Sequence, residues 1–417
     1  MEVTRAVASV VFSGVLANEL DEDWHEGPLE LSFRDVVTGA ERRSDRAARL
    51  NYFHPRTNGI LYGEPTAPCR WHKSGPLVAG EMMVAGVEVL NLPRFSGGPG
   101  DVLAIVHIDL PAARPQSALA EFTNSRTRTE AQQSDLVRLL SPIILNSRES
   151  GFPVSYVESE GELEGIVGLG YTDWCAQKQW LWAMATAAPL DQPSIPALRP
   201  DPEDPTLDSG YVYLSSSWRA MVLRSGASFV GNERAETQDE FLSVMAPLYV
   251  RTIYLDAILL GLLQERGLNQ FAERLSRLDE RSARHAEIPN LEDDLTLFRN
   301  TLWWQHITRA GPANGLLIAY QAQHRLPELL EQIVAEFSEY ARQVDASSNL
   351  RTSAALGLLT LVGLPLTLVL TADPIYSSSG IVQLLGALFA GVLIAMAILL
   401  WPAARELLAP LKRRRSD

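Results

Sequence analysis

Two long uncharged segments near the carboxyl end constrain this chain more than any other feature. Residues 353–372 include no charged side chain over twenty positions, and residues 380–401 include none over twenty-two. As helices rising 1.5 Å per residue they would extend about 30 Å and 33 Å, which matches the thickness of a bilayer's hydrocarbon core. Only seven residues separate them. The sequence therefore predicts a tight transmembrane hairpin with both outer ends on one side.

Basic residues flank this hairpin on that side. Arg351 precedes the first segment, Arg405 and the basic run 412–415 follow the second, and the only charged residue of the connecting loop is Asp373. The positive-inside rule assigns basic flanks to the cytoplasm. We therefore expect a multi-pass protein of the inner (plasma) membrane, with both termini in the cytoplasm and membrane lipid as a partner.

Polar residues form one stripe along the first segment. They follow each other at spacings of 4, 7, 7 and 4, which places them on one face of a helix: Asn349, Ser353, Thr360, Thr367 and Thr371. Hydrogen-bonding groups that face lipid lack partners, so we interpret the stripe as the lining of a path between helices. Alternatively, the hydroxyls bond to carbonyls one turn earlier in their own helix.

A local motif precedes and enters this segment. A Ser-Asn-Arg-like approach at residues 348–351 is followed by a leucine-threonine step and then by Leu364-Pro365-Leu366-Thr367. The run from Ala341 to Leu370 resembles the end of the stalk helix and the first membrane helix of the CorA-like magnesium transporter superfamily. The resemblance implies a homo-oligomer, a pentamer, that passes divalent cations such as Mg²⁺ through a pore lined by the first membrane helix.

The loop after the first segment departs from that family. Its members usually carry a Gly-Met-Asn motif there, to which ion selectivity is attributed, whereas this chain has Pro374-Ile375-Tyr376 and no Gly-Met-Asn anywhere. The resemblance therefore supports the fold better than it supports magnesium as the ion. Asp373, beside these three residues at the expected outer pore mouth, would draw in cations if repeated around a ring. Its alternative role is that of an ordinary loop aspartate before a proline turn.

The fold class that we expect is an α/β cytoplasmic domain, then long stalk helices, then a carboxy-terminal two-helix transmembrane hairpin. The domain boundaries are 1–232 for the α/β domain, 233–350 for the helical bundle and stalk, 351–403 for the hairpin and 404–417 for a basic cytoplasmic tail. Six strand-like runs of β-branched and apolar residues separated by turn residues support the first domain. They are Val7–Val15, Leu29–Val37, Val84–Leu92, Val102–Leu110, Tyr211–Ser215 and Ala220–Val230.

The second domain contains a stretch that could be mistaken for a third span. Residues 245–263 are strongly apolar, but Arg251 and Asp256 would each cost several kcal/mol at mid-bilayer. We therefore expect a buried helix of a bundle. A second helix is predicted from Leu291 to Arg309, with Gly311 and the residues after it as its break. A third helix is predicted to follow this break and to run into the membrane. Its heptad seam suits a stalk that packs on its own copies or on the preceding helices, and consists of Leu326, Leu330, Ile333, Phe337, Tyr340 and Val344.

Charge and cysteine content limit the partners. The chain has a net charge of −14, and its last 67 residues carry six basic against three acidic residues, so residues 1–350 have a net charge of −17. A domain this acidic disfavours nucleic acid as a partner. Two cysteines cannot form a disulfide framework, which suits a reducing cytoplasm.

The search for chemistry in the first 350 residues finds weak signals only. No phosphate loop, dinucleotide glycine motif or HExxH occurs, so we expect no enzyme and no cofactor beyond the transported or regulatory cation. Cys69 and His72 have a spacing compatible with zinc but no second pair of ligands, His107 is interpreted as a core residue, and Trp303-Trp304 as helix packing. Two alternatives remain open: a sensor or regulated effector that has lost transport, and a tail-anchored enzyme.

Overall fold

The computed structural model describes the greater part of the first 342 residues. These are residues 3–34, 41–44, 46–64, 67–79, 82–93, 95, 100–123, 138–141, 143–145, 150–161, 163–166, 174–187, 205–233, 241–277, 281–309 and 311–342. The chain divides into two compact units, one of Met1–Arg277 with Pro289–Ile333 and the other of Leu278–Ile288 with Val334–Asp417. The predicted hairpin and basic tail lie outside the described residues.

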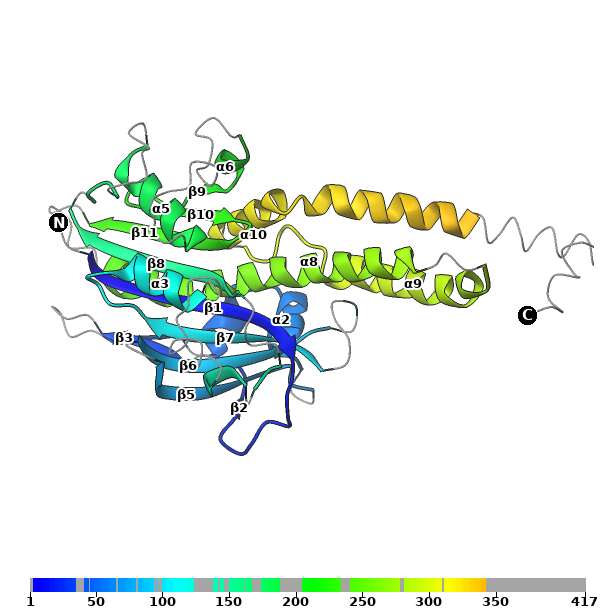
Figure 1. Cartoon of the computed structure of the whole chain (residues 1–417), viewed down its shortest axis with the longest axis horizontal. Coiled ribbons are helices and arrows are strands. Elements are labelled where there is room, and N and C mark those ends of the chain that lie inside the picture. The colour runs from blue at the N-terminus through cyan, green and yellow to red at the C-terminus, as the bar shows by residue number, and fades with distance from the viewer. Residues whose placement is uncertain are drawn as a thin grey trace, which may run out of the picture. The chain divides into compact units, whose positions relative to one another are not determined.

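A nine-stranded sheet forms the centre of the first unit (Figure 1). Its strand order is β2-β5-β6-β7-β1-β8-β11-β10-β9, and a separate two-stranded sheet pairs β3 with β4. The bounds are β1 (Val3–Val15), β2 (His25–Glu26), β3 (Leu31–Arg34), β4 (Glu41–Ser44), β5 (Arg70–Ala79), β6 (Met82–Asn91), β7 (Asp101–Asp109), β8 (Phe152–Glu160), β9 (Tyr211–Tyr213), β10 (Trp218–Leu223) and β11 (Gly226–Glu233).

The central strand β1 pairs on both edges. It runs antiparallel to β7, with Val10 opposite Val106, and antiparallel to β8, with Val10 opposite Pro153. β8 and β11 form a parallel pair, and the other pairings of the large sheet are antiparallel. Because β1 is covered on both faces, its middle is a nearly continuous apolar run, as expected of a buried strand.

Helices cover both faces of this sheet. Their bounds are α1 (Arg46–Tyr52), α2 (Pro55–Tyr62), α3 (Pro115–Thr123), α5 (Ala176–Thr186), α6 (Pro205–Ser209), a π-helical turn η2 (Phe241–Met245), α7 (Ala246–Arg251), α8 (Ile253–Ser276), α9 (Arg281–Thr301) and α10 (Gly311–Gln323). A further helix occupies residues 326–342.

The two faces of β1 pack against different helices. Its even-numbered residues from Ala6 to Phe12 join an apolar core with Leu119 and Phe122 of α3 and Met184 of α5. Its odd-numbered residues lie on the opposite face, where Ser9 belongs to a polar cluster that extends to α8. The result is a three-layer α/β arrangement, which agrees with the α/β class expected for this region.

The apolar segment of the bundle is buried in the first unit. Ala246–Ser276 is the one helical stretch among the described residues long and apolar enough to cross a membrane, and 89% of its most apolar window is buried inside the protein. Thr252, between α7 and α8, has φ −128° and ψ −89°, which interrupts the helix. Arg251 and Asp256 are both buried and both paired with opposite charges. This arrangement is that of the buried helix expected from the sequence.

Several predicted elements need correction. The single strand expected over Ala220–Val230 is wrong, because β10 ends at Leu223 and β11 begins at Gly226, so the chain reverses between them. The helix expected from Leu291 to Arg309 ends at Thr301. Gly311, expected to break a helix, instead begins α10, where the following proline suits a first helical turn because that position needs no N–H donor.

Candidate functional site

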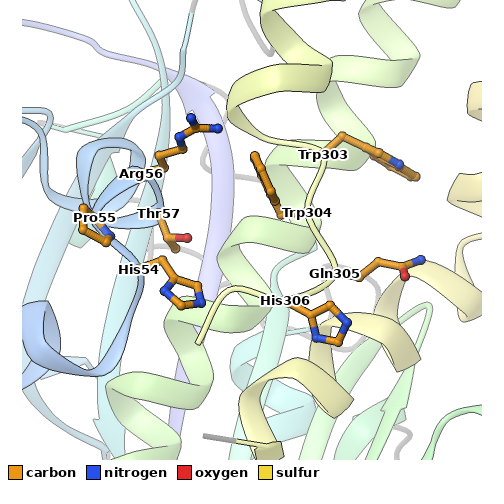
Figure 2. A pocket seen from close by; sticks show the side chains of 8 residues that line it. All are labelled: His54, Pro55, Arg56, Thr57, Trp303, Trp304, Gln305 and His306. Carbon is orange, nitrogen blue, oxygen red and sulfur yellow. The ribbon is translucent and has the colours of Figure 1, made fainter. Parts of the chain in front are cut away.

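A pocket lies where the start of α2 meets the loop between α9 and α10 (Figure 2). Its volume is about 870 Å³, within the range of small-molecule sites. All its lining residues belong to the first unit. They come from two short segments and are His54, Pro55, Arg56, Thr57, Trp303, Trp304, Gln305 and His306.

Main-chain hydrogen bonds tie these two segments together. The N–H of His54 donates to the carbonyl of Ile307 at 2.9 Å, and Phe53 forms an isolated antiparallel bridge with Thr308. The Thr308 hydroxyl donates to the carbonyl of Tyr52. Residues as far as 256 positions apart in the chain are therefore held in fixed register beside the pocket.

A buried glutamine of α8 binds the backbone of the second lining segment, which is the loop after α9. Gln264, which is fully buried, donates from Nε2 to the carbonyl of Leu302 at 2.8 Å and to that of Trp304 at 3.4 Å. Its own Oε1 accepts a 2.8 Å hydrogen bond from Nε2 of Gln321 on α10. Because this amide donates to the loop and accepts from α10, it fixes the backbone of the loop immediately after the end of α9.

An asparagine of α10 closes the same loop at its other end. Asn314 Oδ1 accepts the N–H groups of Ile307 at 2.9 Å and Thr308 at 3.2 Å, and its Nδ2 donates to the Thr308 carbonyl at 2.9 Å. The Asn314 side chain thus satisfies backbone groups of these two residues that no helix or strand pairs. With Gln264 it preorganises the loop that presents the two tryptophans.

The lining combines aromatic surface, cationic charge and hydrogen-bond donors. Figure 2 shows the Trp304 ring between α2 and Trp303, with the imidazoles of His54 and His306 below it. The Arg56 guanidinium lies 5.3 Å from the Trp304 ring centroid, a cation–π contact. Trp304 is 38% exposed. The first residue of α2 is Pro55, which has no N–H, so the donors without an acceptor in this helix are the N–H groups of Arg56 and Thr57, and the N-cap His54 makes no side-chain capping bond.

A second polar group, the buried charge cluster, lies between the sheet and α8. It comprises Arg49, Arg70, Glu88, His107 and Asp256, with Ser9 and Tyr62 at its ends, and all seven are fully buried. Each of the two arginines contacts both carboxylates. Two guanidinium groups thereby balance two carboxylates, which is the condition under which ions are tolerated in a protein interior.

The cluster is connected from strand to helix. Arg70 donates from Nη1 to Asp256 Oδ1 at 2.7 Å and from Nε to Glu88, and Tyr62 donates to Asp256 Oδ2 at 2.6 Å. The His107 ring contacts Glu88 Oε1 at 2.9 Å through Nε2 and Ser9 Oγ at 2.8 Å through Nδ1. A continuous chain of polar side chains therefore connects α8 with β5, β6, β7 and β1.

Burial sets the ionisation of this cluster. It lowers the pKa of His107 to about 4, although the hydrogen bond with Glu88 acts in the opposite direction. Burial by itself would raise the pKa of Glu88, but the charge of Arg70 and the bond from His107 hold it well below its usual range. For Tyr62, burial and the neighbouring Asp256 charge raise the pKa well above its usual value. Neutral His107 and ionised Glu88 are the stable forms at neutral pH.

The weak sequence signals have different outcomes. His107 lies in the core, as expected. Cys69 donates to the Ile60 carbonyl at 3.3 Å and His72 Nδ1 contacts the Gly27 carbonyl at 2.9 Å. Among the residues that the structure describes, which lie with gaps between 3 and 342, no group of three or more His, Cys, Asp or Glu side chains could hold a metal ion.

The expectation for Trp303-Trp304 is wrong about the helix, because both residues follow the end of α9 at Thr301. Its packing part holds for Trp303, whose ring lies 6.0 Å from that of Phe298 on α9. Both tryptophans also line the pocket. The sequence signal for this position is the adjacent run of Trp, Trp, Gln and His, which the predicted helix includes.

The predicted pore residues lie outside the described residues. This applies to the expected pore lining and to the expected outer mouth alike: Asn349, Ser353, Thr360, Thr367, Thr371, Asp373, Pro374, Ile375 and Tyr376. They and the pocket belong to different parts of the chain. Comparisons with protein-family models, curated proteins and solved structures found no match for this chain.

Proposed function

We propose that this chain forms an oligomeric membrane channel of CorA-like organisation, a pentamer, that admits divalent cations, Mg²⁺ or a related ion. The observation that carries the proposal is the polar stripe on an uncharged segment that is followed, after seven residues, by a second uncharged segment. An inside-negative potential contributes about 4.6 kcal/mol per doubly charged ion per 100 mV to such entry. Passive influx is therefore the direction proposed.

The order of elements supports the same proposal. An α/β sheet domain comes first, helices follow, and the helix over residues 326–342 ends about ten residues before Ser353. Leu326 and Ile333, the first and third residues of the predicted heptad seam, are buried. In this proposal the stalk leads into the first membrane helix, and a movement of the α/β domain would reach the pore as tilt or rotation.

Ion flux into liposomes tests the channel. The purified full-length protein is reconstituted under an inside-negative potential, and uptake of Mg²⁺, Co²⁺, Ni²⁺, Zn²⁺ and Na⁺ is measured separately. We expect selective divalent uptake, and we expect Thr360→Val with Thr367→Val to reduce it at least fivefold because neutral oxygens are lost from the path. The matched control is Thr360→Ser with Thr367→Ser, which keeps both hydroxyls.

Assembly must be measured beside flux. Each variant is checked for the same oligomeric mass in lipid nanodiscs before its uptake is compared. Unchanged uptake by the double Val variant would refute the lining assignment, and absence of any uptake by a correctly assembled oligomer would refute transport.

A second candidate function is a membrane-anchored sensor or regulated effector whose α/β domain binds a ligand. The specific observation in its favour is the pocket of His54, Arg56 and Trp304, whose loop is held by the buried Gln264 and the partly buried Asn314. Preorganisation of this kind lowers the entropic cost of binding. The two functions are compatible, since ligand binding in the α/β domain could regulate the hairpin.

A further inference from the structure

We propose that the pocket binds a small organic anion with a planar ring, such as a mononucleotide or an aryl carboxylate. The ring would stack on the indole of Trp304, and the anionic group would lie at Arg56 and the start of α2. The inference gives a ligand class to the second candidate function and does not depend on ion flux.

The aromatic half of this site is Trp304. This residue is 38% exposed, although the backbone of its loop is held at both ends, by Gln264 at the start and by Asn314 at the end. The indole Nε1 donates to the Asn300 carbonyl at 3.3 Å, which fixes the ring further. A rigid, exposed indole offers stacking surface at small conformational cost, and base–aromatic stacking is typically favourable by about 1–3 kcal/mol.

The anionic half is the first turn of α2. Arg56 supplies a permanent cation, and the N–H groups of this turn point out of the helix at its positive end. The lining includes two imidazoles and no carboxylate. Helix N-termini with an adjacent Arg are suited to phosphate and carboxylate groups. The pocket itself, formed by two segments far apart in the chain, is the independent reason to treat this helix start as a site.

The two halves are close enough to serve one molecule. Arg56 and Trp304 are already in contact, with 5.3 Å between the guanidinium carbon and the ring centroid, and Figure 2 shows the two side chains next to each other. A ligand that stacks on the indole therefore brings an attached anionic group within reach of Arg56. A volume of about 870 Å³ accommodates a ring, a linker and an anion together.

The test measures binding to the full-length protein in lipid nanodiscs by calorimetry. The probes are AMP and naphthalene-2-carboxylate, and their halves are adenosine, 2-naphthylmethanol and inorganic phosphate. We expect at least one complete probe to bind at least tenfold more tightly than its own halves. AMP as the tighter ligand would indicate a nucleotide-like phosphate, and naphthalene-2-carboxylate as the tighter ligand an aryl carboxylate.

Matched variants locate the binding. Arg56→Gln and Trp304→Leu should each weaken the complete probe at least tenfold, whereas Trp304→Phe should recover most of the affinity because it restores a ring. Arg309→Gln is the control, since Arg309 is an exposed arginine of the same loop outside the pocket lining. The affinity of the Arg309→Gln variant for the complete probe should match that of the unsubstituted protein.

Several outcomes would overturn the inference. These are binding of neither complete probe, equal affinity for a probe and its neutral half, and tight binding that persists in Arg56→Gln and Trp304→Leu. None of these outcomes bears on ion uptake, so the liposome measurement stands or fails separately. Conversely, a protein without flux that binds AMP through Arg56 would favour the sensor function.

Discussion

The pocket and the buried charge cluster use the same kinds of side chain in opposite ways. Both contain arginine, histidine and an aromatic ring, and both take residues from α2, Arg56 in the pocket and Tyr62 in the cluster. In the cluster every charged group is fully buried and faces an opposite charge. In the pocket Arg56 is exposed and faces a ring.

This difference separates a structural role from a binding role. A buried guanidinium is already neutralised by its partners, so its removal leaves another ion without compensation. An exposed guanidinium at a preorganised cavity can still accept an anion from solvent. The composition of a site is therefore a poor guide to its role until the burial and the partners of each group are known.

The largest effect is expected from breaking the cluster at α8. Asp256→Asn leaves Arg70 without its 2.7 Å carboxylate partner in a fully buried position. We expect the free energy of unfolding to fall by about 3–5 kcal/mol, as is typical when one member of a buried ion pair is removed. Denaturant unfolding of the purified protein measures it.

The control for this measurement is Asp293→Asn, because Asp293 is an exposed aspartate of α9. An exposed substitution of this type should change stability by less than about 0.5 kcal/mol. A similar small change for Asp256→Asn would show that the cluster does not stabilise the fold.

Acidification should weaken the cluster through His107. Its pKa in the folded protein is about 4, whereas an unfolded histidine has the ordinary value of 6.5, so between these pH values the unfolded chain binds more protons. Stability should therefore fall as the pH decreases from about 6.5 to about 4, by about 3 kcal/mol over the whole window if the other groups are unchanged. Glu88, whose pKa is lowered in the folded protein, adds a further loss of stability when the pH falls below the pKa of an unfolded glutamate.

The variant His107→Gln isolates this contribution. Unfolding midpoints of the two proteins are compared at several pH values between 7 and 4. The variant should be less stable at pH 7 and should show a smaller decrease toward pH 4. Parallel pH profiles for the two proteins would contradict the assignment of the window to His107.

The smallest effect on stability is expected from Gln264→Leu. This change also tests most directly whether buried groups outside the pocket lining support binding in the pocket. The change removes the donor to Leu302 and Trp304 and leaves Gln321 without its 2.8 Å acceptor. We expect a loss of about 1–3 kcal/mol in unfolding free energy. Because the loop is no longer held, the affinity for AMP or naphthalene-2-carboxylate should also fall, although Gln264 does not line the pocket.

Calorimetry and unfolding on the same preparation measure the two effects together. Ser276→Ala, an exposed change at the end of α8, serves as the control for substitution in this helix. Unchanged affinity in Gln264→Leu would mean that the loop keeps its path without this glutamine.

Apolar periodicity predicted only part of the central sheet. The runs that form β1, β6 and β7 contain enough valine, isoleucine and leucine to indicate buried strands directly. β5 and β8 are not among the predicted strands: Arg70 and Lys73 interrupt the pattern of β5, and serine and glutamate interrupt that of β8, although β8 pairs with β1. The sequence could not show that Arg70 is buried, since its partner Asp256 lies 186 positions away.

The candidate pocket was beyond the same reasoning. It depends on the meeting of two loops through His54 and Ile307, and on the side-chain amides of Gln264 and Asn314, which fix one of these loops. No local pattern records such a meeting. Arg251 and Asp256, in contrast, predicted from the sequence alone that the apolar stretch around them is no membrane span, because charged side chains are costly at mid-bilayer whatever their partners are.

The central position of β1 has a consequence for synthesis on the ribosome. Val3–Val15 is translated first, yet its neighbours β7 and β8 begin at Asp101 and Phe152, and β11 ends at Glu233. About 120 further residues are translated before Ser353. At about 5–20 residues per second this takes about 6–24 s. The nascent chain can therefore complete its sheet before residues 353–401 leave the ribosome. If these residues insert into a membrane as proposed, a folded domain and not an open chain would accompany them.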